Sequence, residues 1–261
     1  MITVLGARGF IGSHLVAHLG RCGLAYRAPE RGTPLEGCEL GHVIDCVGIT
    51  GDHVDRPLEI IEAHVGRVAA LLRSASFDSF LYLSSTRLYL HASGPAREED
   101  ALLFDPADAG YLYNLSKAAG EALVLSLGEK GRIVRLATIY GPGQRHTFLA
   151  TILEEAKAQG VIPLRSALES QRDYLSVEDA VGLIVKIALG GRHRLYNVAS
   201  GVEVAHAQIV DLLAKLCGWR VEVAADALVV RPPPIDISRI RDEFDFRPRN
   251  LFDILPTLVA A

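Results

Sequence analysis

Tyr113 and Lys117 are the residues whose types and spacing point most directly to chemistry. They begin and end the stretch YNLSK, and a helix would place both side chains on one face. A tyrosine has an ordinary pKa of about 10, and lowering it by about three units takes roughly 4 kcal/mol of preferential stabilisation of the phenolate. Because a nearby Lys117 ammonium can supply much of that, the pattern predicts that Tyr113 exchanges a proton with a substrate hydroxyl or carbonyl group. The alternative is a chance pairing on an amphipathic helix.

Hydroxyl side chains end the predicted strand that runs into LSSTRLY, residues 83–89. At that end of a parallel sheet they would face the crevice where ligands bind. Ser85 is our candidate for the group that hydrogen-bonds the reacting oxygen and aims it at Tyr113. Thr86 is a second choice, as a substrate contact. The alternative is that Ser84, Ser85 and Thr86 only satisfy backbone groups at the end of the strand.

A glycine-rich turn lies between the first predicted strand and the first helix. Gly6, Gly9 and Gly12 form the pattern G-x-x-G-x-x-G, with Phe10 and Ile11 inside it. Glycine allows the tight turn and the close approach of a pyrophosphate, whose charge meets free N–H groups at the start of a helix. The pattern predicts a dinucleotide-binding turn, and the alternative is a packing turn in any strand–helix–strand unit.

Two residues after the second predicted strand bear on which dinucleotide would bind. An acidic side chain at this place holds the adenosine ribose hydroxyls of NAD, whereas an arginine accepts the 2′-phosphate of NADP. The chain has Glu30 and then Arg31, so NAD is favoured because Glu30 would repel the phosphate, and NADP stays possible. A solvated loop pair is the alternative. With a nicotinamide cofactor, Lys117 would also bind the nicotinamide ribose, and Tyr113 would move its proton as hydride moves at the same carbon.

Apolar runs and helical periodicity alternate along the chain, which predicts an α/β fold with a doubly wound parallel Rossmann sheet. We expect residues 1–140 to form the dinucleotide-binding domain and residues 141–261 a smaller mixed α/β substrate-binding lobe, part of which can return to the Rossmann core. The segment between Arg31 and Val43 is short, so one helix–strand connection should be trimmed. The predicted strands are Ile2–Leu5, Ala25–Ala28, Val43–Val47, Phe80–Ser85, Ile133–Leu136 and Leu195–Ser200, and the predicted helices are Ser13–Leu19, Leu58–Ala75, Tyr113–Leu127, Thr147–Gln159, one opened by Asp179, Ala207–Cys217 and Ile237–Phe244.

Composition excludes several classes of function. The 261 residues are 49% hydrophobic and carry a formal net charge of -4 without a basic stripe, so we expect no nucleic-acid partner. No apolar stretch is long enough to span a membrane, and the N-terminus lacks the features of a signal peptide, so we expect a cytoplasmic protein. The four cysteines have neither the spacing of a zinc site nor that of a disulfide framework, and no metal is expected.

The motifs, taken together, resemble the extended short-chain dehydrogenase/reductase family, also described as NAD-dependent epimerase/dehydratase, over nearly the whole chain. The resemblance implies an oxidoreductase or isomerase that binds NAD or NADP, acts on a nucleotide sugar and forms a homodimer. It also gives Ser85, Tyr113 and Lys117 the catalytic roles argued above. The stretches that carry it are GARGFIG, LSSTRLY, YNLSK, VRLATIYGPGQ, QRDYLSVEDA and YNVASG.

Two arginines match positions that contact the substrate in this family. The arginine of the RDY motif and a later arginine before a proline bind nucleotide phosphates there, and Arg172 and Arg231 stand at these positions. The guanidinium fork suits a diphosphate, so the resemblance implies that both bind the substrate. Ordinary salt bridges are the alternative for each, and Asp173 and Asp179 are interpreted as structural.

The chain also departs from the family pattern. Thr86 and Arg87 stand where the 4,6-dehydratases carry an Asp-Glu pair, so dehydration is disfavoured. His64 replaces a common asparagine and is either a proton carrier or a histidine satisfied by a neighbour. Leu90 replaces a glycine.

Three hypotheses follow for the activity. The first is an NAD(P)-dependent epimerase or reductase that acts on a hydroxyl or keto carbon of a nucleotide sugar. The second is an NADP-dependent reductase of a small ketone intermediate in a biosynthetic pathway. The third, a non-catalytic dinucleotide-binding protein, is disfavoured because both Tyr113 and Lys117 are present.

Overall fold

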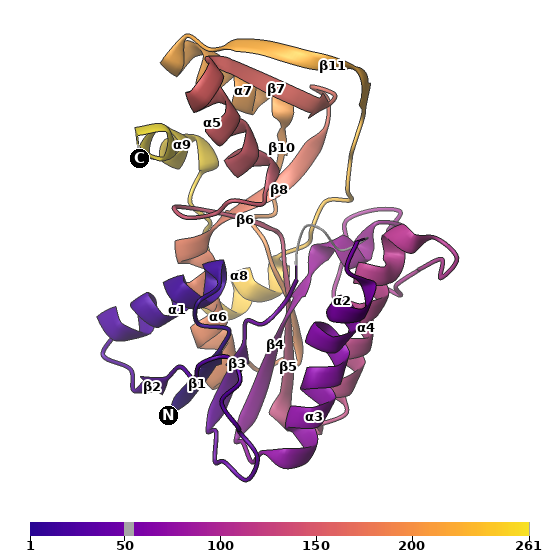
Figure 1. Ribbon diagram of the computed structural model, residues 1–261, viewed down its shortest axis with the longest axis vertical. Coiled ribbons are helices and arrows are strands. Elements are labelled where there is room, and N and C mark those ends of the chain that lie inside the picture. Colours follow the sequence, from indigo (N-terminus) through magenta and orange to yellow (C-terminus); the bar gives the residue numbers. More distant parts are fainter. Residues whose placement is uncertain (50–54, 261) are drawn as a thin grey trace.

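The computed structural model describes residues 1–49 and 55–260 and shows a parallel sheet covered by helices, with a second lobe beyond one end of its strands (Figure 1). Apart from the two-residue edge strand Tyr26–Arg27, its strands are short, mainly apolar runs that are largely buried, as parallel strands between helical layers are. The sheet has six strands in the order β2-β1-β3-β4-β5-β9, and every pairing is parallel. These strands are β1 (Ile2–Leu5), β2 (Tyr26–Arg27), β3 (His42–Asp45), β4 (Ser79–Ser85), β5 (Gly131–Leu136) and β9 (Leu195–Val198).

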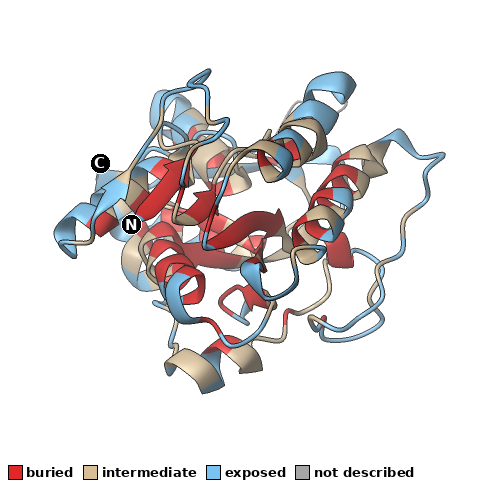
Figure 2. Ribbon diagram, turned by 90° about the horizontal axis from the view of Figure 1, so that it is seen from below, coloured by how far each residue is buried: buried red, intermediate tan, exposed pale blue. Residues whose placement is uncertain are grey.

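Helices cover both faces of the sheet, and alternate residues of each strand point to opposite layers. In β4, Leu81 and Leu83 pack in the layer that contains α1 and α6, whereas Phe80 and Tyr82 pack in the layer that contains α3 and α4. Figure 2 shows the sheet as the buried centre of this arrangement. The helices are α1 (Phe10–Arg21) and α6 (Val177–Gly190) on one face, and α2 (Pro57–Ile61), a π-helical turn (Glu62–Gly66), α3 (Arg67–Ser74) and α4 (Leu112–Leu125) on the other.

The second lobe has its own core, built between two small sheets and three helices. β6, β8 and β10 form one sheet, and β7 pairs with β11 in the other. The elements are β6 (Thr138–Tyr140), α5 (Phe148–Gln159), β7 (Val161–Ser166), β8 (Gln171–Ser176), β10 (Glu203–Ala205), α7 (His206–Cys217), β11 (Arg220–Leu228) and α9 (Leu251–Ala260). The chain returns to the large sheet between the segments that build this lobe. There β9 pairs with β5, α6 packs on one face of the sheet, and α8 (Ser238–Phe244) packs beside β9.

The Rossmann fold and the trimmed connection are confirmed. From 28 to 41 the chain runs through turns from β2 to β3 with one isolated bridge, Glu39 to Ser76. The sequence analysis missed β6, β7, β8, β10, β11 and α9. Polar residues open β8, Pro163 interrupts β7 and Pro256 lies inside α9, so these segments lack the apolar periodicity on which the predictions relied.

A buried polar network joins the sheet to α4. Arg135 of β5 donates Nε to Glu121 Oε1 at 2.9 Å and Nη2 to Oε2 at 2.6 Å. Its Nη1 donates to Tyr89 Oη at 2.7 Å, and that hydroxyl donates to Asn197 Oδ1 at 2.8 Å. The side chains of Arg135 and Glu121 are only 5% exposed, so each charge offsets the cost of removing the other from water.

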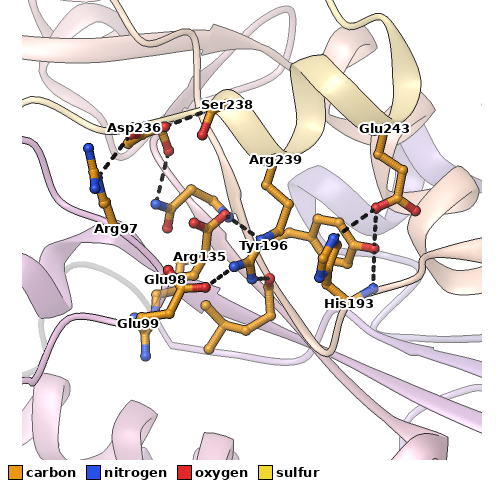
Figure 3. Close-up of polar contacts among 12 residues, drawn as sticks. Arg97, Glu98, Glu99, Arg135, His193, Tyr196, Asp236, Ser238, Arg239 and Glu243 are labelled. Atoms are coloured by element: carbon orange, nitrogen blue, oxygen red, sulfur yellow. Dashed lines mark hydrogen bonds and ion pairs between the residues drawn. The ribbon is translucent and has the colours of Figure 1, made fainter.

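A second polar cluster holds the outer edge of the sheet (Figure 3). Arg239 of α8 donates to the Leu195 carbonyl at 2.6 Å and forms ion pairs with Glu98 and Glu99. Tyr196 of β9 donates to Glu243 at 2.9 Å. These contacts fasten α8 and the segment around residue 98 to β9.

We expect Glu121→Gln to lower the free energy of unfolding by about 3 to 5 kcal/mol, because Arg135 would keep a buried charge without its carboxylate. Chemical denaturation measures this. The exposed Glu129→Gln is the matched control and should change stability by less than about 0.5 kcal/mol. A loss below about 1 kcal/mol for Glu121→Gln would show that Glu121 does not offset the cost of burying the Arg135 charge.

Candidate active site

The predicted catalytic residues meet where the strands of the large sheet end. Ser85 is the last residue of β4, and the glycine turn follows β1. Tyr113 and Lys117 lie on the first turns of α4, which packs against β4 and β5. The carboxyl ends of neighbouring parallel strands share one edge, and this is the usual place for a ligand on a doubly wound sheet.

Tyr113 and Ser85 contact each other directly. Their side chains are hydrogen-bonded, and Ser85 Oγ also accepts from the Arg87 N–H at 3.2 Å. Burial raises the pKa of Tyr113 above its ordinary value, although the Ser85 hydrogen bond and the Arg87 charge lower it. The lowered pKa that the sequence analysis expected is therefore not found. At pH 7 Tyr113 is a neutral phenol, the form that donates a proton.

Lys117 is buried, and its ammonium is held by the sheet. Nζ donates to the Leu83 carbonyl at 2.8 Å and lies 4.7 Å from the centre of the Tyr82 ring. Burial lowers the pKa of Lys117 to about 8, while the charge of Asp45 raises it. Asp45 is itself buried and forms an ion pair of 2.5 Å with Arg67. Lys117 therefore keeps most of its positive charge at pH 7.

His64 is a buried neutral histidine. Its Nε2 accepts from the Ile49 N–H at 3.2 Å, so the ring hydrogen is on Nδ1, which donates to Ser116 Oγ at 2.8 Å. Ser116 in turn donates to the Tyr113 carbonyl at 2.8 Å. Burial and the charge of Lys117 lower the pKa of His64 to about 2. Of the two interpretations, the histidine satisfied by its neighbours fits this geometry.

The glycine turn has the shape that a pyrophosphate needs. Gly6 has a φ of +74°, and the Gly9 N–H donates to its carbonyl at 2.9 Å. A Cβ on Gly12 would lie 2.2 Å from that same oxygen, so no other residue fits there. Gly9 precedes α1 without a side-chain cap, which leaves the N–H groups of the first turn, with Phe10 and Ile11, for a ligand. These residues fit the phosphates of a dinucleotide.

The residues beside the turn include one that the sequence analysis missed. Arg8, inside the glycine pattern, forms an ion pair with Glu30, and both side chains are exposed. Its position within the motif was the available signal. Arg31 is also exposed. A carboxylate and an arginine therefore stand together beside the glycine turn.

The predicted substrate contacts are spread over the two lobes. Thr86 donates Oγ1 to the Leu136 carbonyl at 3.3 Å. Arg172 of β8 is half-buried, and its Nε has no hydrogen-bond partner among the described residues. Arg231 is exposed and donates to the Glu169 carbonyl at 3.2 Å, and the preceding Val230 carbonyl accepts from the Gln171 N–H at 2.9 Å, so Arg231 lies beside the start of β8. Leu90 has a φ of -50°, so this position does not require the glycine of the family pattern.

The two aspartates of the QRDYLSVEDA stretch hold loops. Asp173 accepts from the Ser200 and Gly201 N–H groups at 2.8 and 2.7 Å. Asp179 accepts from the Arg249 N–H at 2.9 Å. Both contacts agree with the structural interpretation.

Arg87 lies beside Tyr113, a place that was not predicted for it from the sequence. Its guanidinium carbon is 5.4 Å from the centre of the Tyr113 ring, and Nη2 donates to the Gly110 carbonyl at 3.3 Å. The signal in the sequence was the replacement of an acidic pair by Thr86 and Arg87.

Comparison with known proteins agrees with this geometry. Residues 35–199 match the model of the NAD dependent epimerase/dehydratase family, which is more than half of the chain. The chain belongs to this family. Its relatives include a dTDP-glucose 4,6-dehydratase of Streptomyces griseus, 29% identical over 99% of this chain and 93% of the relative. A GDP-6-deoxy-D-mannose reductase of Pseudomonas aeruginosa is 28% identical over 88% of this chain and 84% of the relative.

Solved structures of similar fold include MoeE5 in complex with UDP-glucuronic acid and NAD. It superimposes with a TM-score of 0.81 at 22% identity, over 99% of this chain and 97% of that one. The prediction of an enzyme of the epimerase/dehydratase type is thus confirmed at the level of family and fold.

Other features of this family member lie outside the predicted catalytic residues. A polar cavity of about 530 Å³ is lined by charged residues of the outer-edge cluster, among them Arg97, Arg239 and Glu243, which pair within that cluster. Within residues 1–49 and 55–260, no group of three or more His, Cys, Asp and Glu side chains could hold a metal ion. No helix in the described part of the chain is long and apolar enough to cross a membrane.

We expect Lys117→Met to be more stable than the wild type at pH 7. A pKa lowered from 10.5 to about 8 means that the folded state binds protons less readily, which costs roughly 3 kcal/mol below pH 8. As pH rises through 8 towards 10, the unfolded wild type binds more protons than the folded one, so wild-type stability gains about 1.4 kcal/mol per pH unit relative to the variant.

Denaturant titrations at pH 7, 8, 9 and 10 measure this difference. Lys186→Met, at an exposed lysine of α6, is the control and should show no such trend. A constant difference between Lys117→Met and the wild type across this range would contradict a buried, charged Lys117.

Proposed function

We propose that the chain is an NAD(P)-dependent enzyme that oxidises or reduces a hydroxyl or keto carbon of a nucleotide sugar, as an epimerase or as a reductase. The observation that carries this proposal is the buried contact of Tyr113 with Ser85, one helical turn from the charged Lys117. The contact lies at the strand ends next to the glycine turn, and membership of the family supports the same reading.

Several residues of the chain would hold the cofactor. Gly6, Gly9 and Gly12 with the start of α1 would bind the pyrophosphate. Glu30 would bind the adenosine ribose, and Lys117 the nicotinamide ribose. Because Arg8 and Arg31 are also at hand for a 2′-phosphate, the site can serve NADP as well as NAD. When bound, NAD(P) supplies the hydride acceptor and donor.

Tyr113 would carry the proton. Its neutral phenol can donate to a carbonyl oxygen during reduction, and the phenolate that this leaves is the form that accepts a proton when a hydroxyl is oxidised. Ser85, already hydrogen-bonded to Tyr113, would donate to the same oxygen and fix its position. The buried Lys117 charge favours the negatively charged oxygen that develops during the transfer.

Arg172 supports a substrate with a diphosphate. It brings a guanidinium with an unpartnered, buried Nε to the described site, and a fork of this kind suits phosphate oxygens. Dehydration stays disfavoured, although relatives of the chain include enzymes named dTDP-glucose 4,6-dehydratase. The hydroxyl of Thr86 and the guanidinium of Arg87 cannot replace two carboxyl groups in removing water.

We expect Tyr113→Phe to lower kcat by at least about 100-fold, because the proton transfer loses its acid and base. Calorimetric titration should show that the variant binds NAD or NADP as tightly as the wild type does. Titrations with UDP-, dTDP- and GDP-linked sugars should likewise give equal affinities for the two proteins. Tyr26→Phe, at a partly exposed tyrosine of β2, is the control.

Failure of the wild type to bind either dinucleotide would refute the proposal. Preference for NADP without binding of any nucleoside diphosphate would instead identify a reductase of a small ketone. Full activity of Tyr113→Phe would show that Tyr113 is not the proton donor and acceptor.

We expect His64→Asn to lower kcat/KM by about tenfold while leaving the shape of its pH profile unchanged. The reason is that His64 positions Tyr113 through Ser116 and, with a pKa of about 2, does not titrate between pH 5 and 9. Rates measured across this range test the prediction, with the exposed His146→Asn as control. Loss of a limb of the profile between pH 5 and 7 in His64→Asn alone would identify a proton carrier instead.

A further inference from the structure

Arg87 carries a positive charge that the described part of the protein does not neutralise. It is half-buried, and its guanidinium has one hydrogen bond, to the Gly110 carbonyl. Within residues 1–49 and 55–260 it forms no ion pair. Arg67 and Arg135, by contrast, each pair with a buried carboxylate. A partly desolvated charge without a partner is costly, and an anionic ligand would offset that cost.

The backbone of Arg87 is fixed at the catalytic residues. Its N–H donates to Ser85 Oγ at 3.2 Å, and its carbonyl accepts from Asn114 Nδ2 at 3.2 Å. Asn114 is the neighbour of Tyr113 on α4, and the guanidinium carbon lies 5.4 Å from the Tyr113 ring centre. The position of this charge is therefore set by the same elements that place the reacting groups.

A second guanidinium approaches from the other lobe. Arg172 is close enough for its charge to lower the pKa of Arg87, in addition to the effect of burial. Arg172 also forms no ion pair within the described residues, and its Nε lacks a hydrogen bond. These two like charges repel each other, and an anionic group near both would relieve this repulsion.

We propose, resting on the proposed function, that Arg87 binds a carboxylate of the sugar itself, so that the substrate is a nucleotide-linked uronic acid. Arg172 is then left for the diphosphate. The position of Arg87 decides which anionic group it would bind. Arg87 lies against the ring of Tyr113, whose hydroxyl would act on the sugar carbon. A carboxylate on the sugar ring lies within reach of that carbon, whereas the diphosphate lies beyond the anomeric carbon. The guanidinium fork matches the two oxygens of a carboxylate.

The test compares sugars that differ only in this carboxylate. Dissociation constants are measured by calorimetry for UDP-glucose against UDP-glucuronate and for GDP-mannose against GDP-mannuronate, on protein saturated with its preferred dinucleotide. Wild type should bind at least one acidic sugar about tenfold or more tightly than its neutral partner. Arg87→Gln should bring that ratio close to one, and Arg87→Lys should give an intermediate ratio because it keeps the charge but loses the fork.

Arg73→Gln, at an exposed arginine of α3, is the matched control and should keep the wild-type ratio. Equal binding of acidic and neutral sugars by the wild type, or an unchanged ratio in Arg87→Gln, would overturn this assignment and leave the proposed function standing. Binding of the dinucleotide with none of these four sugars and with no dTDP-linked sugar would overturn both.

Discussion

The site depends on keeping one ammonium charged inside the protein. Lys117 is 4% exposed, and burial alone would favour its neutral form. The Leu83 carbonyl and the charge of Asp45 oppose that tendency, and Asp45 is itself held by Arg67. The Lys117 charge is thus stabilised by groups near the ends of β3 and β4 and, through Asp45, by Arg67, the first residue of α3. A displacement of any of these elements would change the electrostatics beside Tyr113.

Close approach of the helices to the strand ends makes this arrangement possible. A Cβ on Gly48 would lie 3.4 Å from both His64 Nε2 and Lys117 Nζ, and one on Gly120 would lie 2.7 Å from the His64 carbonyl. Gly120 therefore lets α4 pack closely against the π-helical turn, whereas the loop after β3 lies at ordinary contact distance from both side chains at Gly48. The turn widens the helix at His64, as such turns often do at functional sites, and the histidine uses both ring nitrogens to join the three segments.

The parts of the site that could be predicted from the sequence are motifs formed by residues that lie close together in the chain. The glycine turn, the Tyr113 and Lys117 spacing and Ser85 after its strand are local patterns, and the structure brings the last three together. The pKa of Tyr113 and the place of Arg87 could not be predicted, because both depend on burial and on distant segments. In the fold, alternating apolar runs indicated the large sheet. The small strands of the second lobe are half-exposed, and their pairing partners lie far along the chain, as β7 with β11 shows.

The replacement of two acidic residues by Thr86 and Arg87 changes what this scaffold can do more than it changes the fold. Thr86 bonds the Leu136 carbonyl, and the Arg87 backbone still holds Ser85, so the strand end keeps its geometry without carboxylates. The side chain beside Tyr113 is positively charged, however. A positive group there lowers the pKa of the phenol and favours anionic ligands, whereas acid and base for elimination are lost. This arrangement agrees with the proposed proton and hydride transfer without dehydration, and it makes the charges that line the site the feature that would select the ligand.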